Sequence, residues 1–526
     1  MRAYRSLRAA MKNVVLFLRF AVSTVLVCAM PAWAQPPVLS ANGVNYQGQW
    51  LQADQVQAFY GVPFAQPPVD DLRWQAPRPL HDVGPAAGRV LAHATQFAAA
   101  CYQGPHIAKW YRGVVESFGG DPDTVLQPPV AEDCLYLNIW APAGAEPGSL
   151  PVMVYVHGGS NKGGFSFEPN YHGEHLAAQG VVVVSVAYRL GIFGFFSHPE
   201  LQQSNFALLD IAAALRWVKA HVSAVGGDAG NITLVGESAG GNNIIHLIAS
   251  DSSHELFQRA VVQSAGWAMD SKVTRAASLA TGEQADADLA GGKGLAALRQ
   301  VSAQALLEHA ERMALEFDPV VDGDTVTAPV ADWLVSAGPL PDLLIGSNAD
   351  EWKMYLDESA SLTQWFEDSG LTPDQIAALS YELGEAALAD ERSALDRLIT
   401  AQQFVCPSLA LARQTRAAGA ASYVYLFARQ RAGEQAATMG AYHGAELPYV
   451  FNTHDSWLPT SAVDHAITER MMRAWLNFAA QGDPNPVSGD GLMWPEFDQR
   501  SLAYRLDTTD AVLPHRDSRL CQLLRL

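Results

Sequence analysis

The stretch Gly236 to Gly240 reads G-x-S-x-G and contains the residue types that present a nucleophile. Small residues two positions before and two after Ser238 permit the sharp turn that exposes a serine Oγ at the end of a strand. An apolar, β-branched run, 232–235, precedes the motif, and helix-compatible residues follow it. The pattern predicts a nucleophile elbow with Ser238 as the nucleophile. A serine that only caps a helix is the alternative for so short a motif.

A serine hydroxyl attacks an ester only with help from a neighbouring base, and that base needs an orienting acid. In the order serine, acid, histidine, the acid is expected in a loop after a later strand. Asp350 and Glu351 both follow the apolar run 343–346, and their spacing does not choose between them. His443 lies further on between small residues and is the candidate base, with an ordinary surface or core histidine as the alternative.

The oxyanion that forms on an attacked ester needs backbone N–H donors held where the charge develops. The loop His157-Gly158-Gly159-Ser160 follows a predicted strand and lies upstream of the elbow, as that role requires. The N–H of Ala239, after the nucleophile, completes the expected set of donors. An ordinary glycine turn is the alternative for this loop.

The elements that must position these groups alternate between strand and helix. The run 181–188 is almost entirely apolar, which is typical of a strand buried on both faces. Alternation of strands with helices predicts an α/β fold with a central, mostly parallel sheet. The Ala-rich segment 276–335 is expected to form helices that cap the sheet. The other elements we expect are strands at 135–140, 151–156, 259–263, 342–347 and 422–428, and helices at 208–222 and 469–480, after a loose start at 35–41.

Composition places the chain among globular proteins. Of its 526 residues, 49% are hydrophobic and 17% are charged, which excludes a disordered or fibrous chain. No internal repeat or long linker is visible, so we expect residues 35–526 to form a single domain. A boundary in the Gly/Pro stretch 338–341 is the alternative.

The first 34 residues have the pattern of a secretory signal peptide. Basic residues are followed by an apolar stretch, 14–30, and by Ala32-Trp33-Ala34, which predicts cleavage after Ala34. The alternative is a membrane anchor, but Arg19 leaves an uninterrupted run shorter than the roughly 20 residues of a spanning helix. We therefore expect a protein exported to the periplasm or secreted, without a stable membrane anchor.

The chain is strongly acidic, with 34 basic and 54 acidic residues and a formal net charge of −20. Removing the five basic residues of the leader leaves 29 basic residues beside 54 acidic ones, a net charge of −25. Such a surface argues against nucleic acid or anionic membranes as partners.

Four cysteines remain after the predicted cleavage, and an even number in an exported chain predicts two disulfides. Four cysteines allow three connectivities. Their spacing fits neither a zinc site nor a C-x-x-C redox motif, so no metal and no cofactor are expected. They are Cys101, Cys134, Cys406 and Cys521.

Taken together, the motifs resemble the type-B carboxylesterase family, which includes the cholinesterases and has the α/β-hydrolase fold. The resemblance extends through nearly all of the mature chain, and its motifs occur in the family's order. They are YGVPFAQPPVDDLRW from Tyr60, EDCLYLNIW from Glu132, HGGS from His157, AYRLGIFGF from Ala187, GGDAGNITLVGESAGG from Gly226, SNADEW from Ser347 and YHGAELPYVF from Tyr442.

The resemblance implies roles for individual residues. It makes Glu351, rather than Asp350, the acid that orients the base. It pairs Cys101 with Cys134 and Cys406 with Cys521. The implied triad is Ser238, Glu351 and His443, and the implied oxyanion donors are the N–H groups of Gly159, Ser160 and Ala239.

The chain also departs from the family's pattern. Ser160 replaces the third glycine of HGGG, and Asn161 and Lys162 follow where an aromatic residue is usual. A serine still has an N–H, so oxyanion stabilisation is expected if the backbone angles suit a Cβ. Lys162 is a candidate contact for an anionic substrate group, with a solvated lysine as the alternative.

The tryptophan with which cholinesterases hold a quaternary ammonium group is not at the matching spacing before Cys134. Trp110 and Tyr111 lie elsewhere in that loop, and because cation recognition needs an aromatic face, no choline ester is predicted.

We therefore predict a cofactor-free serine carboxylic-ester hydrolase acting on small to medium acyl or aryl esters through an acyl-enzyme. The alternatives are a lipase-like esterase acting at interfaces and a non-catalytic binding protein of the same fold. The sequence does not indicate an oligomeric state.

Overall fold

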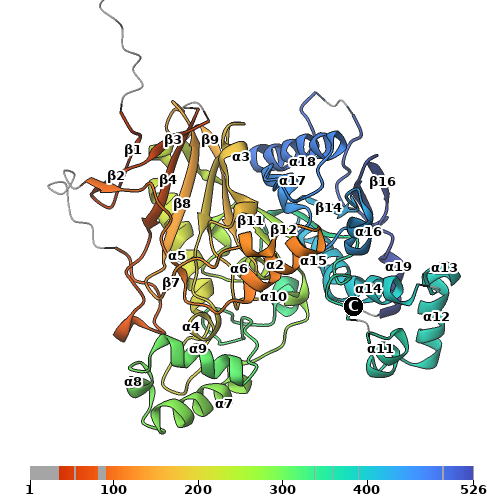
Figure 1. Cartoon of the computed structure of the whole chain (residues 1–526), viewed down its shortest axis with the longest axis horizontal. Helices are drawn as coiled ribbons and strands as arrows, with labels where there is room; N and C mark the ends of the chain where they lie inside the picture. Colours follow the sequence, from red (N-terminus) through yellow and green to blue (C-terminus); the bar gives the residue numbers. More distant parts are fainter. Residues whose placement is uncertain are drawn as a thin grey trace, which may run out of the picture. The chain divides into compact units, whose positions relative to one another are not determined.

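An eleven-stranded sheet forms the centre of the protein (Figure 1). The computed structural model describes residues 35–524 except 53–54, 81–90, 337, 358, 389 and 489–490. The predicted signal peptide, residues 1–34, lies outside the described residues. In spatial order, the strands are β16 (Ala511–Pro514), β15 (Leu502–Leu506), β14 (Ser422–Phe427), β13 (Asp342–Asn348), β12 (Arg259–Gln263), β11 (Gly227–Glu237), β9 (Leu150–Val156), β10 (Val182–Val186), β8 (Tyr136–Pro142), β4 (Val56–Pro63) and β3 (Gln49–Leu51).

The seven strands from β15 to β10 in this order run parallel, and the strands outside them pair antiparallel. Parallel strands need covered faces, and the residues of β10 are all buried. The mostly parallel sheet of an α/β-hydrolase that the sequence predicts is thereby confirmed.

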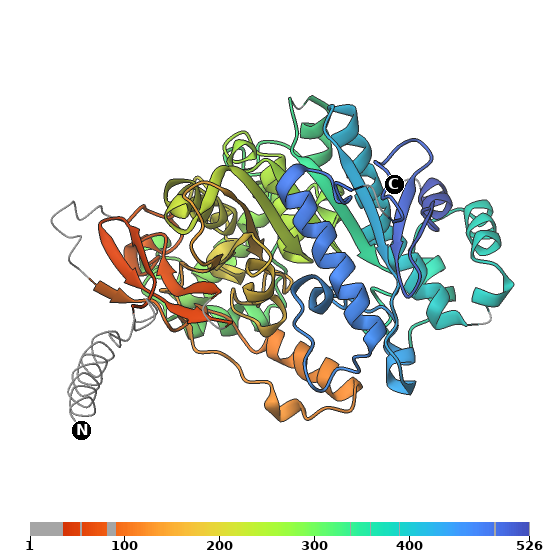
Figure 2. The same ribbon diagram turned by 90° about the horizontal axis from the view of Figure 1, so that it is seen from above.

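Alternate residues of the central strands face two separate hydrophobic cores. Val154 and Leu234 belong to one core, while Tyr155 and Val235 belong to the other. The first core is completed by α5 (Phe206–His221), α6 (Ala239–Ile248) and α15 (Cys406–Ala417). The second is completed by α3 (Glu174–Ala177), α17 (Leu447–Phe451) and α18 (Ala462–Gln481), the long helix that lies across the sheet in Figure 2. This two-sided burial fixes the strand ends that carry the candidate site.

The remaining helices gather in groups around the sheet. The Ala-rich segment forms helices as expected, and α7, α8 and α9 lie together in Figure 1. The helices not yet listed are α2 (His106–Ser117), α4 (Gly191–Gly194), α7 (Arg275–Ala285), α8 (Leu295–Leu298), α9 (Ala303–Arg312), α10 (Val330–Ser336), α11 (Leu362–Asp368), α12 (Pro373–Leu383), α13 (Glu385–Leu388), α14 (Glu391–Thr400), α16 (Glu434–Met439) and α19 (Ser518–Leu524). Within the described part of the chain, none of the helices has the length and apolar character needed to cross a bilayer.

One local expectation was wrong, and one predicted helix is longer than expected. The loose start expected at 35–41 contains β1 (Val38–Ala41), which pairs antiparallel with β2 (Val44–Gln47), because the two strands are joined by a tight turn at Asn42 and Gly43. The helix expected at 469–480 is confirmed as the later part of α18, which begins earlier, at a capping box formed by Ser461 and Asp464.

Candidate active site

Ser238 occupies the tight turn between β11 and α6. Its backbone angles, φ 56° and ψ −128°, lie where a residue with a Cβ is strained. The N–H of Ser238 donates to the carbonyl of Gln263 on the neighbouring strand at 2.9 Å, which holds the turn in place. The elbow therefore presents the serine at the carboxyl end of the central strands.

Both motif glycines are required by close contacts. A Cβ at Gly236 would lie 2.8 Å from Ile244 Cδ1 and 2.9 Å from the carbonyl carbon of Gly240. A Cβ at Gly240 would collide with the carbonyl oxygens of Val156 and His157. The turn can pass between β9 and α6 only because these two positions lack side chains.

His443 connects the serine to a buried carboxylate. Its Nε2 lies 2.9 Å from Ser238 Oγ, and its Nδ1 lies 2.7 Å from Glu351 Oε2. Glu351 is completely buried, and its Oε1 accepts a 2.6 Å hydrogen bond from the N–H of Asn348. A neutral imidazole protonated at Nδ1 can donate to Glu351 and accept the hydroxyl proton of Ser238.

The structure separates the two carboxylates between which the spacing could not choose. Glu351 faces His443, whereas Asp350 Oδ2 accepts hydrogen bonds from the N–H of Ala441 at 2.8 Å and from Gln430 Nε2 at 3.2 Å. Asp350 therefore contacts the backbone of the segment that leads to His443 rather than its imidazole.

A further carboxylate, Glu237, lies directly beside the imidazole. Its Oε1 is 3.2 Å from His443 Nε2, and burial raises the pKa of Glu237 well above its usual range. Burial alone would lower the pKa of His443, but the nearby carboxylates of Glu237 and Glu351 outweigh that effect and raise it. The site therefore stabilises an imidazolium, the species that a general base becomes after it takes a proton.

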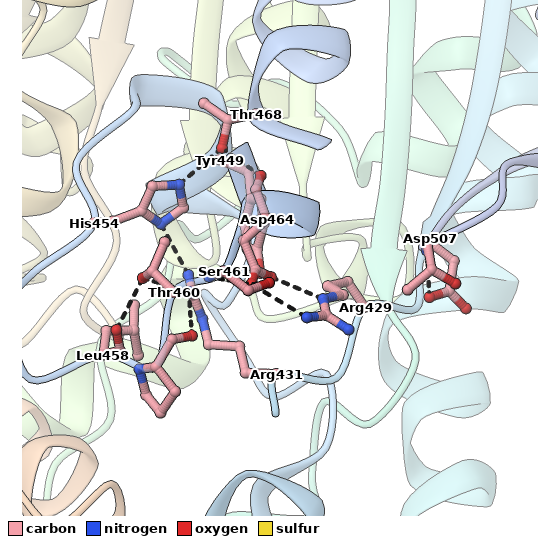
Figure 3. Close-up of polar contacts among 12 residues, drawn as sticks. Arg429, Arg431, Tyr449, His454, Leu458, Thr460, Ser461, Asp464, Thr468 and Asp507 are labelled. Carbon is pink, nitrogen blue, oxygen red and sulfur yellow. Dashed lines mark hydrogen bonds and ion pairs between the residues drawn. The ribbon is translucent and has the colours of Figure 1, made fainter. Parts of the chain in front are cut away.

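The segment that carries His443 is anchored by a polar network at α17 and α18 (Figure 3). Tyr449 of α17 donates to Asp464 Oδ1 at 2.7 Å, and Arg429 donates to both oxygens of Asp464 at 2.8 and 3.2 Å. Arg431 contacts His454 Nδ1 at 3.1 Å. Because α17 begins four residues after His443, this network holds the helix that directly follows the base.

The loop after β9 supplies the candidate oxyanion donors. Gly159 has φ 105° and Ser160 has φ 55°, so a residue with a Cβ occupies a left-handed conformation at a cost of about 1–2 kcal/mol. Within the described residues, no acceptor binds the N–H groups of Gly159, Ser160 or Ala239. Gly159 and Ser160 line the cavity beside Ser238, where these donors are available to a ligand.

Ser238 opens into a cavity of about 660 Å³, a size that suits a small organic molecule. Its walls come mainly from α2, the oxyanion loop and the segments around Trp352 and Phe404. The lining residues are His106, Ile107, Trp110, Tyr111, Gly158, Gly159, Ser160, Glu168, Tyr171, Glu237, Ser238, Trp267, Asp270, Trp352, Tyr355, Gln402, Gln403, Phe404, His443, Gly444 and Leu447.

Lys162 lies apart from this cavity. Its Nζ pairs with Glu316 Oε1 at 2.6 Å, and the residue lines a neighbouring cavity of about 310 Å³. Lys162 is not among the residues that line the cavity of Ser238. His106 lines both cavities.

Two disulfides join the four cysteines of residues 35–524. Cys101 is bonded to Cys134, with 4.9 Å between their Cα atoms, and Cys406 is bonded to Cys521, with 5.2 Å. The first closes the loop that contains α2. Among the described residues, there is no cluster of three or more His, Cys, Asp or Glu side chains able to hold a metal ion.

Sequence reasoning missed several residues of the cavity wall. Glu237 stands within the G-x-S-x-G motif, and its position next to the nucleophile was the available signal. Glu168 had no comparable signal, because only the folded loop after β9 carries it to the cavity. Trp110 and Tyr111 were noted in the disulfide loop, and α2 brings both into the wall.

Comparison with known proteins agrees with this geometry. A sequence profile described as the carboxylesterase family matches residues 40–518. Fumonisin B1 esterase from Sphingopyxis macrogoltabida is 32% identical over 510 residues, which cover 90% of this chain and 87% of that protein. Cholinesterase from Mus musculus is 31% identical over 523 residues, which cover 90% of this chain and 83% of that protein.

Proposed function

This chain belongs to the carboxylesterase family and is a carboxylic-ester hydrolase, and from that premise we propose that it works through an acyl-enzyme on Ser238. The observation that carries the proposal is the continuous contact from Ser238 Oγ through His443 to Glu351, at 2.9 and 2.7 Å. A chain of this kind activates a serine hydroxyl as a nucleophile.

In the acylation step, Ser238 Oγ bonds to the ester carbonyl carbon while His443 Nε2 takes the hydroxyl proton. The carbonyl oxygen becomes an oxyanion, which the N–H groups of Gly159, Ser160 and Ala239 stabilise. The intermediate then breaks its bond to the alcohol oxygen, and His443 returns the proton to that leaving group. The acyl group remains on Ser238.

Deacylation repeats the same proton transfers with water. His443 takes a proton from a water molecule while the water oxygen attacks the acyl carbon. The bond between the acyl carbon and Ser238 Oγ then breaks as His443 passes the proton to the serine oxygen. Glu351 orients the imidazole and stabilises its charged form in both halves. The products are the carboxylic acid and free enzyme.

The cavity supports small to medium acyl or aryl esters as substrates. About 660 Å³ with several aromatic walls accommodates such molecules. Replacement of Ser238 by Ala is expected to abolish hydrolysis of p-nitrophenyl esters without loss of the fold. Ser264, a buried serine after the adjacent strand β12 whose Oγ has no partner among the described residues, provides the matched control.

The Ser264→Ala protein is expected to retain most of the activity, because removal of an unpartnered hydroxyl breaks no hydrogen bond. Equal activity of the Ser238→Ala protein and the wild type would refute the proposed nucleophile.

We also propose that the protein acts after export. Two disulfides favour an oxidising compartment. N-terminal sequencing of the mature protein is expected to begin at Gln35, and an N-terminus at Met1 in the purified periplasmic or secreted fraction would contradict cleavage.

A further inference from the structure

The cavity wall carries more carboxyl groups than basic groups. Three carboxyl side chains line the cavity, those of Glu168, Glu237 and Asp270. Among the described lining residues, there is no lysine or arginine. His443 pairs with Glu237 at 3.2 Å, so the imidazole of His106 is the one other basic group that lines the cavity beside Glu168 and Asp270. A cleft with an excess of one sign of charge between low-dielectric walls attracts ligands of the opposite sign.

Aromatic side chains form much of the same wall. Trp110 Nε1 donates to Tyr355 Oη at 2.9 Å, and the rings of Trp110 and Tyr111 meet edge to face at 4.9 Å between centroids. These contacts hold the rings in fixed orientations. The face of an indole or phenol ring attracts a cation, and the attraction is strongest where water is excluded.

Glu168 is the acidic group placed among these rings. It is only 4% exposed, its Oε1 accepts from the N–H of Phe165 at 2.8 Å, and its Oε2 accepts from Tyr111 Oη at 2.7 Å. A carboxylate has about four acceptor positions, so each oxygen retains capacity for another donor. Glu168 is therefore fixed in place and still able to bind a ligand's N–H.

Burial raises the pKa of Glu168 to about 7, in spite of the hydrogen bonds from Tyr111 and the N–H of Phe165. Among the described residues, therefore, no cationic side chain pairs with the ionised carboxylate of Glu168. A cation bound beside it would supply that partner and stabilise the ionised form.

We propose that Trp110, Tyr111 and Glu168, hereafter the amine wall, bind a protonated primary or secondary amine on the ester substrate. The ammonium N–H donates to Glu168, and the ring faces of Trp110 and Tyr111 cover its remaining charge. This specificity rests on the proposed esterase function and adds a substrate class to it. A quaternary ammonium group has no N–H, so it cannot make the bond to Glu168.

Binding is tested first, without turnover, in the Ser238→Ala protein at about pH 8, where Glu168, with a pKa of about 7, is ionised. The ligands are hexylammonium, hexyltrimethylammonium and n-hexanol. The affinity of each is measured from the quenching of tryptophan fluorescence. Hexylammonium is expected to bind about ten- to hundredfold more tightly than the other two, the usual size of a charge-assisted hydrogen bond. Equal affinity for the amine and the alcohol, or for the two cations, would overturn the amine wall.

The variants Glu168→Gln and Glu316→Gln each remove one negative charge from the Ser238→Ala protein. Glutamine keeps the shape of Glu168 and an acceptor for the N–H of Phe165, so the loop is expected to remain folded. Glu316 does not line the cavity and pairs with Lys162 outside it, so it controls for net charge. Only Glu168→Gln is expected to abolish the preference for hexylammonium. If Glu168→Gln and Glu316→Gln bound each of the three ligands with the same affinity, the result would count against the proposal.

Hydrolysis separates this proposal from the esterase mechanism. The wild type is assayed on aminopentyl butyrate and on hexyl butyrate, which have nearly the same shape and differ in charge. A higher kcat/KM for the amino ester, lost in Glu168→Gln, is the expected result. Equal kcat/KM for both esters contradicts the amine wall alone. Hydrolysis of neither ester, with the hexylammonium preference intact, contradicts the proposed mechanism alone.

Discussion

Asp350 and Ala441 are joined by two hydrogen bonds of opposite direction. The N–H of Asp350 donates to the carbonyl of Ala441 at 3.1 Å, and the N–H of Ala441 donates to Asp350 Oδ2 at 2.8 Å. Gly440 leaves room for this contact, since a Cβ there would lie 2.7 Å from Asp350 Cγ. The loop that carries Glu351 is thus fastened to the segment that carries His443.

We predict that Asp350→Ala lowers kcat/KM by about a hundredfold, because a displacement of about 1 Å between catalytic groups has an effect of this size. Asp350→Asn retains an oxygen acceptor for Ala441 and is expected to lose much less. Ester hydrolysis measured across pH is the readout, since a looser contact between Glu351 and His443 also shifts the acid limb. A normal pH profile with full activity in Asp350→Ala would show that the two loops hold their positions without it.

Glu237 sets the pH at which His443 becomes an available base. Its carboxylate raises the pKa of His443, and a protonated imidazole cannot accept the serine proton, so activity falls as pH decreases. Glu237→Gln removes that charge, lowers the pKa of His443 and is expected to move the acid limb of kcat/KM to lower pH. Glu446→Gln is the control, with a smaller shift in the same direction, because Glu446 affects His443 less. An unmoved acid limb in Glu237→Gln would contradict this assignment.

The backbone of Ser160, rather than its hydroxyl, is predicted to serve the reaction. Ser160→Gly removes the strain of φ 55° and keeps the N–H, while Ser160→Ala keeps the strain and removes the hydroxyl. Both variants are expected to retain kcat, because loss of one oxyanion donor would reduce it about 10²–10³-fold and neither change removes a donor. Steady-state kinetics on p-nitrophenyl acetate measures this. A hundredfold decrease in Ser160→Ala would assign the stabilisation to the hydroxyl instead.

The two disulfides are predicted to stabilise the fold to different extents. The bonded cysteines are separated by 33 and 115 residues, and the chain-entropy relation gives about 4 and about 5 kcal/mol, respectively. Replacing Cys406 and Cys521 by serine is expected to lower the melting temperature more than replacing Cys101 and Cys134. Thermal unfolding under matched conditions measures both variants. Unchanged melting of the Cys406/Cys521 variant would mean that its bond does not form in solution.

The parts of the site that depend on short sequence segments could be predicted from the sequence. The elbow at Ser238 and the glycine loop at Gly159 follow directly after strands, and local sterics dictate their residue types. The choice between Asp350 and Glu351 was beyond such reasoning, because neighbouring residues in a loop point in directions that only the packed structure fixes. It required the family resemblance.

The cavity wall depended on long-range packing and was missed. Trp110 and Glu168 are 58 positions apart in the chain, and no periodicity relates them. They line one cavity because the fold brings α2 and the loop after β9 together beside Ser238. Lys162, which the sequence offered as a substrate contact, instead pairs with Glu316 beside a second cavity.

The central claim is that Ser238 is an activated nucleophile, and intact-protein mass spectrometry after incubation with an organophosphonate ester tests it most directly. The wild type is expected to gain the mass of one phosphonyl group, and the Ser238→Ala protein to gain none. Because the probe reports activation of the serine and not substrate fit, the natural ester need not be known. A folded wild type that gains no mass, or a Ser238→Ala protein that gains the same mass as the wild type, would contradict the claim.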